Sequence, residues 1–555
     1  MKNNRSEEIT SNKINSKNLF FSGVIALTLA NLLVKLVGIV FKVVLINVVG
    51  SEGAGYYSSA YEIYAYLYVI STSGLPVALS LMVSRSRAKG RFSETKKIFE
   101  VAILVFIAIG LVFSVLMIAF ASQLATFIKS PETTLCIISI APTMLFICVS
   151  SCLRGYFQGY QLMAPTAVSQ FIEALGKVAI GATLALWAIH REYPTYIVAA
   201  YAVLGVTFGV FLGMVFLYVR RFFFKEKQYN ELMGAQIQPS SKKRSAKELL
   251  KEMFSIAIPI TISSSVLSLT TIIDTLMVQR GLLKYLNNIA LVHTYYGDYT
   301  TLVISMTNLP TILLYPIANA LVPLITSAHE IGYREGEKKM RSFSMRVIVL
   351  IALPCALGMS VFSKQILSLM FKESSVANAS SWLSVSAMAI IFLGIIAITN
   401  AYLNSAGHQK LPIISMIIGA SVKLLGNYIL LPKIGMIGAS ISTVACYMIA
   451  AIFNIFFTLK YVGSLPDIKN TFVKPLLCTI PSIFAAIIVY FAVSLLISSK
   501  FIVILAIITA IFVYLVLVLK TKTVSEEEIL MLPKGDKICK MLKKSRILPK
   551  KSENE

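Results

Sequence analysis

The sequence predicts an all-α membrane protein, and its composition and the length of its apolar blocks carry that prediction. Of its 555 residues, 57% are hydrophobic and 14% are charged, and the mean hydropathy is +0.77. Water-soluble domains contain about 45–50% apolar and about 25% charged residues. The apolar residues here also come in blocks of about 20 or more, the length that crosses a hydrocarbon core of ~30 Å. A soluble globular fold is therefore excluded.

Each apolar block is expected to be a helix, because backbone polar groups in lipid must be satisfied within the segment itself. Short polar loops separate about fourteen such blocks. The predicted transmembrane spans are residues 19–49, 56–83, 98–122, 133–152, 163–188, 195–219, 253–278, 299–327, 343–363, 376–404, 411–431, 436–459, 472–496 and 500–519.

The longest polar interruption divides the predicted helices into two groups. The expected parts are a cytoplasmic N-terminus (1–18), an N-lobe of helices 1–6 (19–219), a basic cytoplasmic linker (220–252), a C-lobe of helices 7–12 (253–459), helices 13 and 14 (460–519) and a basic cytoplasmic tail (520–555). Helices 1–6 and 7–12 would each begin and end on the same side, so the lobes are predicted to form a parallel repeat around a central cavity. Gly159-Tyr160-Gln161 before helix 5 and Gly407-His408-Gln409 before helix 11 are a weak trace of it.

The formal net charge of +25 is explained by membrane topology. Lys and Arg concentrate in one set of loops, which includes both termini and the linker, and the opposite set carries few. By the positive-inside rule, both termini are predicted to lie in the cytoplasm of a multi-pass protein of the cell membrane. The basic loops would attract anionic phospholipids, and no nucleic-acid partner is expected.

Helix 1 carries ionisable side chains at membrane depth, where such residues are rare and usually functional. Asn31, Lys35, Gly38 and Lys42 share one helical face. The first interpretation is a cationic stripe that lines a cavity and binds a ligand with concentrated negative charge, such as a diphosphate. The second is that Lys42 extends to the membrane interface.

Further charges lie within helices 5, 7 and 11. Glu173 and Lys177 are four residues apart, a spacing that allows an ion pair. This pair either only fixes helix packing or is a cavity charge pair that exchanges partners when substrate arrives. Asp274, with Lys423 and Asn427, is predicted to form a coupling or charge relay. Asp274 would bind a cation, take a proton, pair with Lys423 or face the interface.

Motifs of catalysis are missing from the sequence. It has no phosphate-binding G-x-x-x-x-G-K-[ST] loop, and its four histidines and seven cysteines show no metal-ligand or disulfide spacing. We therefore predict that the protein is not an enzyme and uses no cofactor or metal. Transport would be driven by Na⁺, H⁺ or the membrane potential.

Several segments together resemble one transporter family, in order over about residues 18–520. They are Gly50-Ser51-Glu52-Gly53-Ala54-Gly55-Tyr56-Tyr57, Gly74-Leu75-Pro76-Val77-Ala78-Leu79-Ser80, Arg154-Gly155-Tyr156-Phe157-Gln158-Gly159-Tyr160-Gln161, the stretch from Pro165 to Glu173, Asp274, Tyr296-Gly297-Asp298-Tyr299, Gly407-His408-Gln409-Lys410 and Gly435-Met436-Ile437-Gly438-Ala439-Ser440-Ile441-Ser442-Thr443. The chain resembles the stage V sporulation protein B / polysaccharide biosynthesis branch of the multidrug/oligosaccharidyl-lipid/polysaccharide exporter superfamily.

The resemblance implies two lobes around a central cavity and a flippase for an undecaprenyl-diphosphate-linked saccharide, similar to the lipid II flippase, for cell-wall or spore-cortex synthesis. Lys35 and Lys42, with Asn31, would hold the diphosphate. Arg154 would either meet the headgroup or anchor the membrane interface. Glu52 would act as a gate or only stabilise the turn around Gly53 and Gly55. Wall-synthesis enzymes are candidate partners.

Two alternatives remain open at this point. The first is a cation-coupled multidrug antiporter of the same superfamily, for which an acidic or aromatic cavity would be expected instead of a basic helix 1. The second is a membrane scaffold of the wall-synthesis machinery that no longer transports.

Overall fold

The computed structural model describes residues 2–88, 90–224, 244–267, 269–315, 317–318, 334–463, 468–497, 499–521 and 523, and these residues divide into two compact units. Unit 1 ends at Thr301 and unit 2 begins at Leu302. The predicted lobes, which meet at the linker 220–252, are a different division of the chain and stay a prediction. The compact unit extends further because α10 and α12 pack against α2 and α1. Each unit is described separately below.

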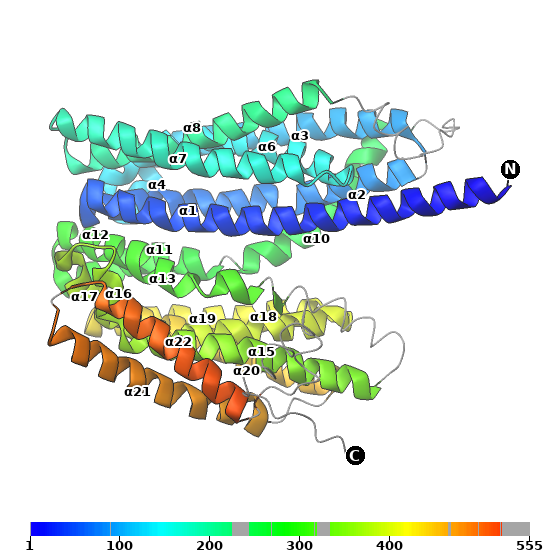
Figure 1. Ribbon diagram of the computed structural model, residues 1–555. Coiled ribbons are helices and arrows are strands. Elements are labelled where there is room, and N and C mark those ends of the chain that lie inside the picture. The colour runs from blue at the N-terminus through cyan, green and yellow to red at the C-terminus, as the bar shows by residue number, and fades with distance from the viewer. Residues whose placement is uncertain are drawn as a thin grey trace, which may run out of the picture. The chain divides into compact units, whose positions relative to one another are not determined.

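Unit 1 consists of long helices that lie side by side (Figure 1). Its elements are α1 (Lys2–Thr72), α2 (Gly74–Ala88), α3 (Phe92–Ala119), α4 (Ala121–Phe127), the 3₁₀ turn η1 (Pro131–Thr133), α5 (Thr134–Ile140), α6 (Thr143–Gly159), α7 (Ala164–His190), α8 (Thr195–Phe222), α10 (Ala246–Leu267), α11 (Leu269–Leu286), α12 (Ile289–Asp298) and the π-helix η2 (Tyr299–Val303), which crosses the boundary.

Unit 2 is also helical in its described part. Its elements are α13 (Ile304–Asn308), α15 (Arg334–Val361), α16 (Ser363–Ser368), α17 (Glu373–Ser386), α18 (Ala389–Ser405), α19 (Lys410–Ile434), α20 (Met436–Tyr461), the π-helix η3 (Lys469–Val473), α21 (Lys474–Ser494) and α22 (Ile502–Lys520). The series α15 to α20 repeats the order and approximate lengths of α3 to α8; α6 and α18, for example, have 17 residues each.

Helix α1 contains the predicted helix 1 and the first part of helix 2. The backbone at Gly50 leaves the helical region (φ 79°, ψ 173°), a conformation that favours glycine. The rings of Phe41 and Tyr57 are 5.6 Å apart, whereas 16 residues of continuous helix would separate them by about 24 Å. The chain therefore folds back on itself at Gly50, and the two halves of α1 lie against each other.

The prediction of an all-α membrane protein is confirmed. Within the described residues, ten helices are long and apolar enough to cross a membrane, or eleven if the pair Glu373–Ser386 and Ala389–Asn404, bent by 42°, is one span. The count of fourteen remains a prediction, because part of the predicted span 299–327 lies outside the described residues.

The described ends of the predicted linker are helical. Helix α8 continues to Phe222, and α10 begins at Ala246. The start of α10 is a reciprocal cap, in which the Glu248 amide donates to Ser245 Oγ (3.2 Å) and the Ser245 amide donates to Glu248 Oε2 (3.1 Å). Residues 225–243 and the tail 524–555 lie outside the described residues.

Candidate functional site

Glycines bring together the helices that carry the predicted charges in unit 1. Gly205, Gly209 and Gly213 recur every fourth residue of α8 and face α7. A Cβ atom added at Gly209 would lie 2.6 Å from the carbonyl oxygen of Glu173, and one added at Gly205 would collide with the backbone of Gly181. Any side chain at Gly205 or Gly209 would push the helices apart. This glycine spacing therefore serves close helix packing.

Lys177 on α7 lies against aromatic rings of α1. Its ammonium nitrogen is 4.5 Å from the centre of the Tyr61 ring, 4.7 Å from that of Phe41 and 5.9 Å from that of Tyr57. A cation within about 6 Å of a ring face is attracted to it. Among the described residues, Lys177 has no carboxylate within 4 Å, so the predicted ion pair with Glu173 does not form.

Glu173 instead pairs with Arg154 of α6. The Arg154 guanidinium donates to Glu173 Oε2 (2.8 Å) and to Ser169 Oγ (3.1 Å). Arg154 is only 7% exposed. These two contacts join α6 to α7, and the predicted roles of Arg154 at the headgroup or at the membrane interface stay predictions. The four-residue spacing of Glu173 and Lys177 did not predict the partner of Glu173, because Arg154 of another helix forms a charge-assisted hydrogen bond with it.

Lys42 donates from Nζ to the carbonyl oxygen of Thr300 in η2 (2.9 Å). The Thr300 hydroxyl in turn donates to Ser58 Oγ (2.9 Å) of the second half of α1. Lys42 is half-buried, so it lies within unit 1 and does not extend away from it. The side chains of Asn31 and Lys35 lie outside the described residues, and their predicted roles stay predictions.

Glu62 is a site residue that the sequence-based analysis missed. It lies on the second half of α1, close enough to Lys42 and Lys177 for its carboxylate to attract both. The sequence does contain a signal for Glu62, because it is an ionisable residue within the predicted span 56–83. Ionisable residues at membrane depth are rare and usually functional, as stated above for helix 1. Unit 1 thus brings together Lys42, Lys177, Glu62 and the Arg154–Glu173 pair.

The predicted gate residue Glu52 lies near the turn of α1. Tyr56 donates its hydroxyl to Glu52 Oε1 (3.0 Å). Here α1 crosses α12 at two glycines, since a Cβ added at Gly297 would lie 2.6 Å from the Gly55 amide nitrogen. The motifs around Gly55 and Gly297 therefore serve a close crossing. His293 is completely buried beside it, with its ring 4.4 Å from that of Tyr56.

The predicted relay residues are buried but belong to different units. Asp274 on α11 of unit 1 is 5% exposed, whereas Lys423 and Asn427 on α19 of unit 2 are 2% and 1% exposed. Their joint role in coupling stays a prediction. In the described residues, no group of three or more His, Cys, Asp or Glu side chains is placed to hold a metal ion.

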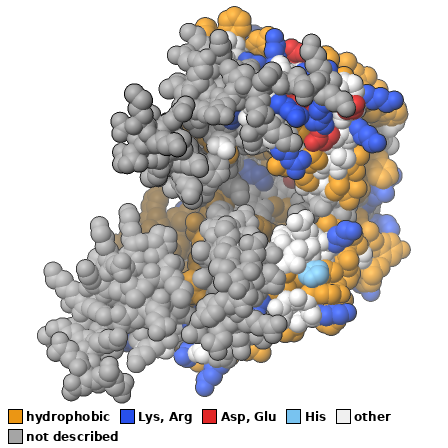
Figure 2. Space-filling model, turned by 90° about the vertical axis from the view of Figure 1, so that its right-hand side faces the viewer, with side chains coloured by type: hydrophobic (Ala, Val, Ile, Leu, Met, Phe, Trp, Pro, Cys, Tyr) orange, Lys and Arg blue, Asp and Glu red, His pale blue; other side chains and the backbone are white. Residues whose placement is uncertain are grey.

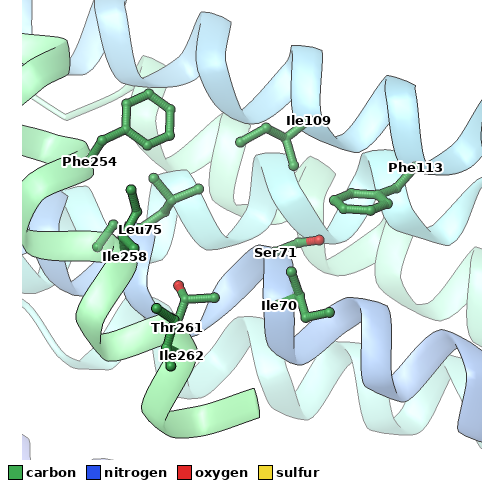
Figure 3. A pocket seen from close by; sticks show the side chains of 10 residues that line it. Ile70, Ser71, Leu75, Ile109, Phe113, Phe254, Ile258, Thr261 and Ile262 are labelled. Atoms are coloured by element: carbon green, nitrogen blue, oxygen red, sulfur yellow. The ribbon is translucent and has the colours of Figure 1, made fainter. Parts of the chain in front are cut away.

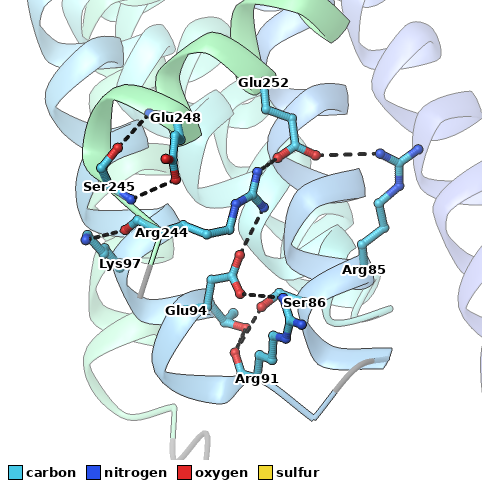
Figure 4. A network of polar contacts seen from close by, with 10 residues as sticks. Arg85, Ser86, Arg91, Glu94, Lys97, Arg244, Ser245, Glu248 and Glu252 are labelled. Carbon is cyan, nitrogen blue, oxygen red and sulfur yellow. Dashed lines mark hydrogen bonds and ion pairs between the residues drawn. The ribbon is translucent and has the colours of Figure 1, made fainter. Parts of the chain in front are cut away.

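An ion-pair network joins α2, α3 and α10 at one end of unit 1 (Figure 4). Arg244 pairs with Glu94 (3.0 Å) and with Glu252, and Glu252 also lies 3.7 Å from Arg85. The hydrogen bond to Glu252 is the main reason why the pKa of Arg244 is raised above its ordinary value. On the face shown in Figure 2, Lys and Arg side chains gather with acidic side chains among them, so that positive and negative charges alternate there.

Each unit also contains an apolar groove. In unit 1, a cavity of about 220 Å³ lies between α1, α3 and α10, with Ile70, Phe113 and Ile258 among its lining residues (Figure 3). In unit 2, a larger groove of about 580 Å³ lies between α15, α21 and α22, lined by side chains such as Leu350 and Tyr514. Both grooves suit hydrocarbon chains and neither suits a charged solute.

Comparison with known proteins decides the family. The polysaccharide biosynthesis protein family matches residues 20–329, which is more than half of the chain. The chain belongs to this family. The MatE family matches residues 299–429. The predicted resemblance is therefore confirmed, and the curated relatives agree with the prediction that the chain is not an enzyme.

Curated relatives of this family member are similar over most of their length. Stage V sporulation protein B of Bacillus subtilis (strain 168) is 26% identical over 434 residues, which are 77% of this chain and 81% of that protein. Lipid II flippase MurJ of the same organism is 24% identical over 457 residues, which are 80% of this chain and 82% of that protein.

Solved structures show the same fold. The lipid II flippase MurJ in an inward closed conformation matches with a TM-score of 0.66 at 16% identity, covering 89% of this chain and 98% of that one. An inward-facing MATE family multidrug resistance transporter of the MOP superfamily matches with a TM-score of 0.60 at 14% identity, covering 78% and 93%.

The backbone refines the repeat that the sequence of this family member suggested. Helices α6 and α18 end in the same turn, with Gln161 (φ 61°) and Gly407 (φ 80°) in the left-handed region. Leu162 then donates to the Phe157 carbonyl and His408 to the Leu403 carbonyl. Gln161, and not Gly159, thus corresponds to Gly407. Counted from these two residues, Lys177 and Lys423 occupy the same position of their helices, 16 residues further on.

Proposed function

We propose that this chain moves an undecaprenyl-diphosphate-linked saccharide from the inner to the outer leaflet of the cell membrane by alternating access. The pair Lys42 and Lys177 carries the proposal, because the two ammonium groups lie on the facing helices α1 and α7, close enough to repel each other. Like charges in a low-dielectric environment are stabilised when they share an anion. A diphosphate is such an anion, with negative charge on two adjacent groups.

The other charged residues take supporting roles in this proposal. Lys35 and Asn31, on the same predicted face of helix 1 as Lys42, extend the diphosphate site. Arg154 keeps Glu173 away from Lys177 by pairing with it at 2.8 Å, which leaves the lysine available to the ligand. Glu52 acts as a gate at the turn of α1, and Asp274, Lys423 and Asn427 serve coupling.

The lipid tail of the cargo needs an apolar path, and the groove of unit 2 supports this part of the proposal. Its volume is about 580 Å³, and α21 and α22 lie outside the repeated series of helices. Saturated or polyprenyl chains gain about 0.8 kcal/mol for each CH₂ group removed from water. We assign this groove to a polyprenyl tail.

The setting of the transport follows from the charge distribution of the loops. Both termini and the basic loops lie in the cytoplasm and contact anionic phospholipids. The driving force is a gradient of Na⁺ or H⁺ or the membrane potential. The saccharide delivered to the outer leaflet is used in cell-wall or spore-cortex synthesis, with wall-synthesis enzymes as partners.

Multidrug efflux is the second candidate, because a MATE family transporter shares the fold. A site for cationic drugs needs acidic or open aromatic surfaces. Here Lys177 occupies the faces of Phe41 and Tyr61, and its charge repels a second cation. The basic character of the site therefore favours the anionic cargo.

Depletion of the protein in its native host tests the proposed function. We expect an undecaprenyl-diphosphate-linked precursor to accumulate in the inner leaflet. The double variant Lys42→Gln/Lys177→Gln, expressed at the wild-type level, should not restore growth or sporulation. Normal precursor levels after depletion, or full complementation by the double variant as expected of a scaffold, would contradict the proposal.

A further inference from the structure

Four tyrosines form a continuous ladder on the second half of α1. Tyr57, Tyr61, Tyr64 and Tyr68 are spaced so that they share one helical face. The ring centres of successive members are 5.8, 5.8 and 6.0 Å apart. Eleven residues of helix extend about 16 Å, so the ladder is as long as two or three linked sugar rings.

The hydroxyl groups of the ladder distinguish it from ordinary aromatic packing. Four of the other buried tyrosines among the described residues donate their hydroxyl to a protein acceptor, namely Tyr56, Tyr296, Tyr402 and Tyr514. Tyrosine hydroxyls in protein interiors usually have such partners. A helix face that needed only rings would carry phenylalanine.

Three ladder hydroxyls have no acceptor among the described residues, namely those of Tyr57, Tyr61 and Tyr64. The Tyr57 hydroxyl is inaccessible to solvent, whereas the hydroxyls of Tyr61 and Tyr64 keep some solvent-accessible surface. Tyr64 is only 5% exposed, so its accessible surface includes the hydroxyl. Two hydrogen-bond donors thus reach accessible space without a protein partner.

Charged groups stand along the same face. The Lys177 ammonium lies 4.5 Å from the centre of the Tyr61 ring and has no hydrogen-bond acceptor among the described residues. Further along, the charge of Glu173 influences Tyr64 and that of Arg154 influences Tyr68. The face therefore combines ring surfaces, two hydroxyl donors without a protein acceptor, the Lys177 ammonium on its rings and a carboxylate–guanidinium pair.

We propose that Tyr61 and Tyr64 of the ladder, together with Lys177, form a subsite that binds the saccharide headgroup of the cargo. This inference rests on the proposed function and names the part of the substrate that the subsite takes. Sugar hydroxyl and acetamido oxygens accept hydrogen bonds from Tyr61 and Tyr64, and the adjoining diphosphate meets Lys177. Apolar sugar faces pack on the rings. A drug cation would leave the donors unsatisfied and would be repelled by Lys177.

The test compares two probes on the full chain in lipid nanodiscs, with binding measured by native mass spectrometry. The probes are lipid II and undecaprenyl diphosphate, which share the tail and the diphosphate and differ in the saccharide-peptide headgroup. The variant Tyr61→Phe/Tyr64→Phe keeps the rings and removes the two accessible hydroxyls. It should bind lipid II at least fivefold more weakly and undecaprenyl diphosphate within twofold of wild type.

Tyr57→Phe is the matched control. It removes a hydroxyl that is inaccessible to solvent from a neighbouring tyrosine of the ladder that lies outside the subsite. It should bind both probes as wild type does. Because none of these hydroxyls has a protein acceptor, all variants should keep the thermal stability of the wild type.

The possible outcomes distinguish failure of the saccharide subsite from failure of the proposed function. Wild-type binding of lipid II no tighter than of undecaprenyl diphosphate, or unchanged lipid II binding by Tyr61→Phe/Tyr64→Phe, would overturn the saccharide subsite and leave the proposed function intact. Failure of the wild type to bind either probe would contradict the proposed function and the subsite with it.

Discussion

Burial of His293 predicts that acid destabilises the crossing of α1 and α12. The side chain is completely buried, and neither ring nitrogen has a hydrogen-bond partner among the described residues. Burial disfavours the charged imidazolium and lowers the pKa of His293 to about 4. The folded state therefore holds the neutral ring, whereas the unfolded chain takes up a proton near pH 6.5.

The sign and size of the effect follow from this difference. The stabilising contribution is complete above about pH 6.5 and is lost as the pH falls toward 4. Because the pKa of His293 is about 4 in the folded state and 6.5 in the unfolded chain, the free energy of unfolding falls by about 3 kcal/mol between neutral pH and pH 4. His293→Phe keeps a ring against Tyr56, 4.4 Å away in the wild type, and removes the titrating group.

Thermal unfolding of the purified protein in detergent between pH 7.5 and 4 checks this prediction. The wild type should lose about 3 kcal/mol more than His293→Phe over this range, and the two should differ little in their pH response above pH 7. Parallel pH profiles for the two proteins would refute the reasoning, because they would mean that His293 titrates normally in the folded state.

Three further predictions concern packing and ion pairs, each measured as thermal stability in detergent. Gly297→Ala should destabilise by about 1–3 kcal/mol because its Cβ would lie 2.6 Å from a backbone nitrogen of α1; Gly358→Ala, where nothing lies within 4 Å, is the control and should not destabilise. A double-mutant cycle of Arg154→Gln and Glu173→Gln should give a coupling energy of about 1–3 kcal/mol, and strict additivity would argue against the pair. Arg244→Gln should cost at most about 1 kcal/mol because the Arg244 side chain is one-third exposed, and a larger loss would show that its contact with the buried Glu94 is more than a surface ion pair.

The sequence predicted the features of the fold that depend on local composition. The length of the apolar blocks and the short polar loops between most of them identified the helices. These signals are local, because the bilayer forces each segment to satisfy its own backbone. The turn at Gly50, which joins two predicted helices, also agrees with a glycine motif read from the sequence.

The candidate site was only partly predictable, because its contacts join distant segments. The spacing of Glu173 and Lys177 suggested an ion pair, but the structure gives Glu173 to Arg154 and places Lys177 on rings of α1. No pattern within α7 specifies either partner. The exact register of the repeat, in which Lys177 matches Lys423, needed the backbone angles, since the left-handed residue is glutamine in one half and glycine in the other.

Translocation of fluorescent lipid II in proteoliposomes tests the central claim most directly. With the purified chain in the bilayer, and with an imposed ion gradient or membrane potential where needed, lipid II should become accessible to a reagent added outside. Lys42→Gln/Lys177→Gln should reduce that rate at least tenfold. Equal rates in liposomes with wild-type protein, with the double variant and without protein would contradict a flippase that holds its cargo through these two lysines.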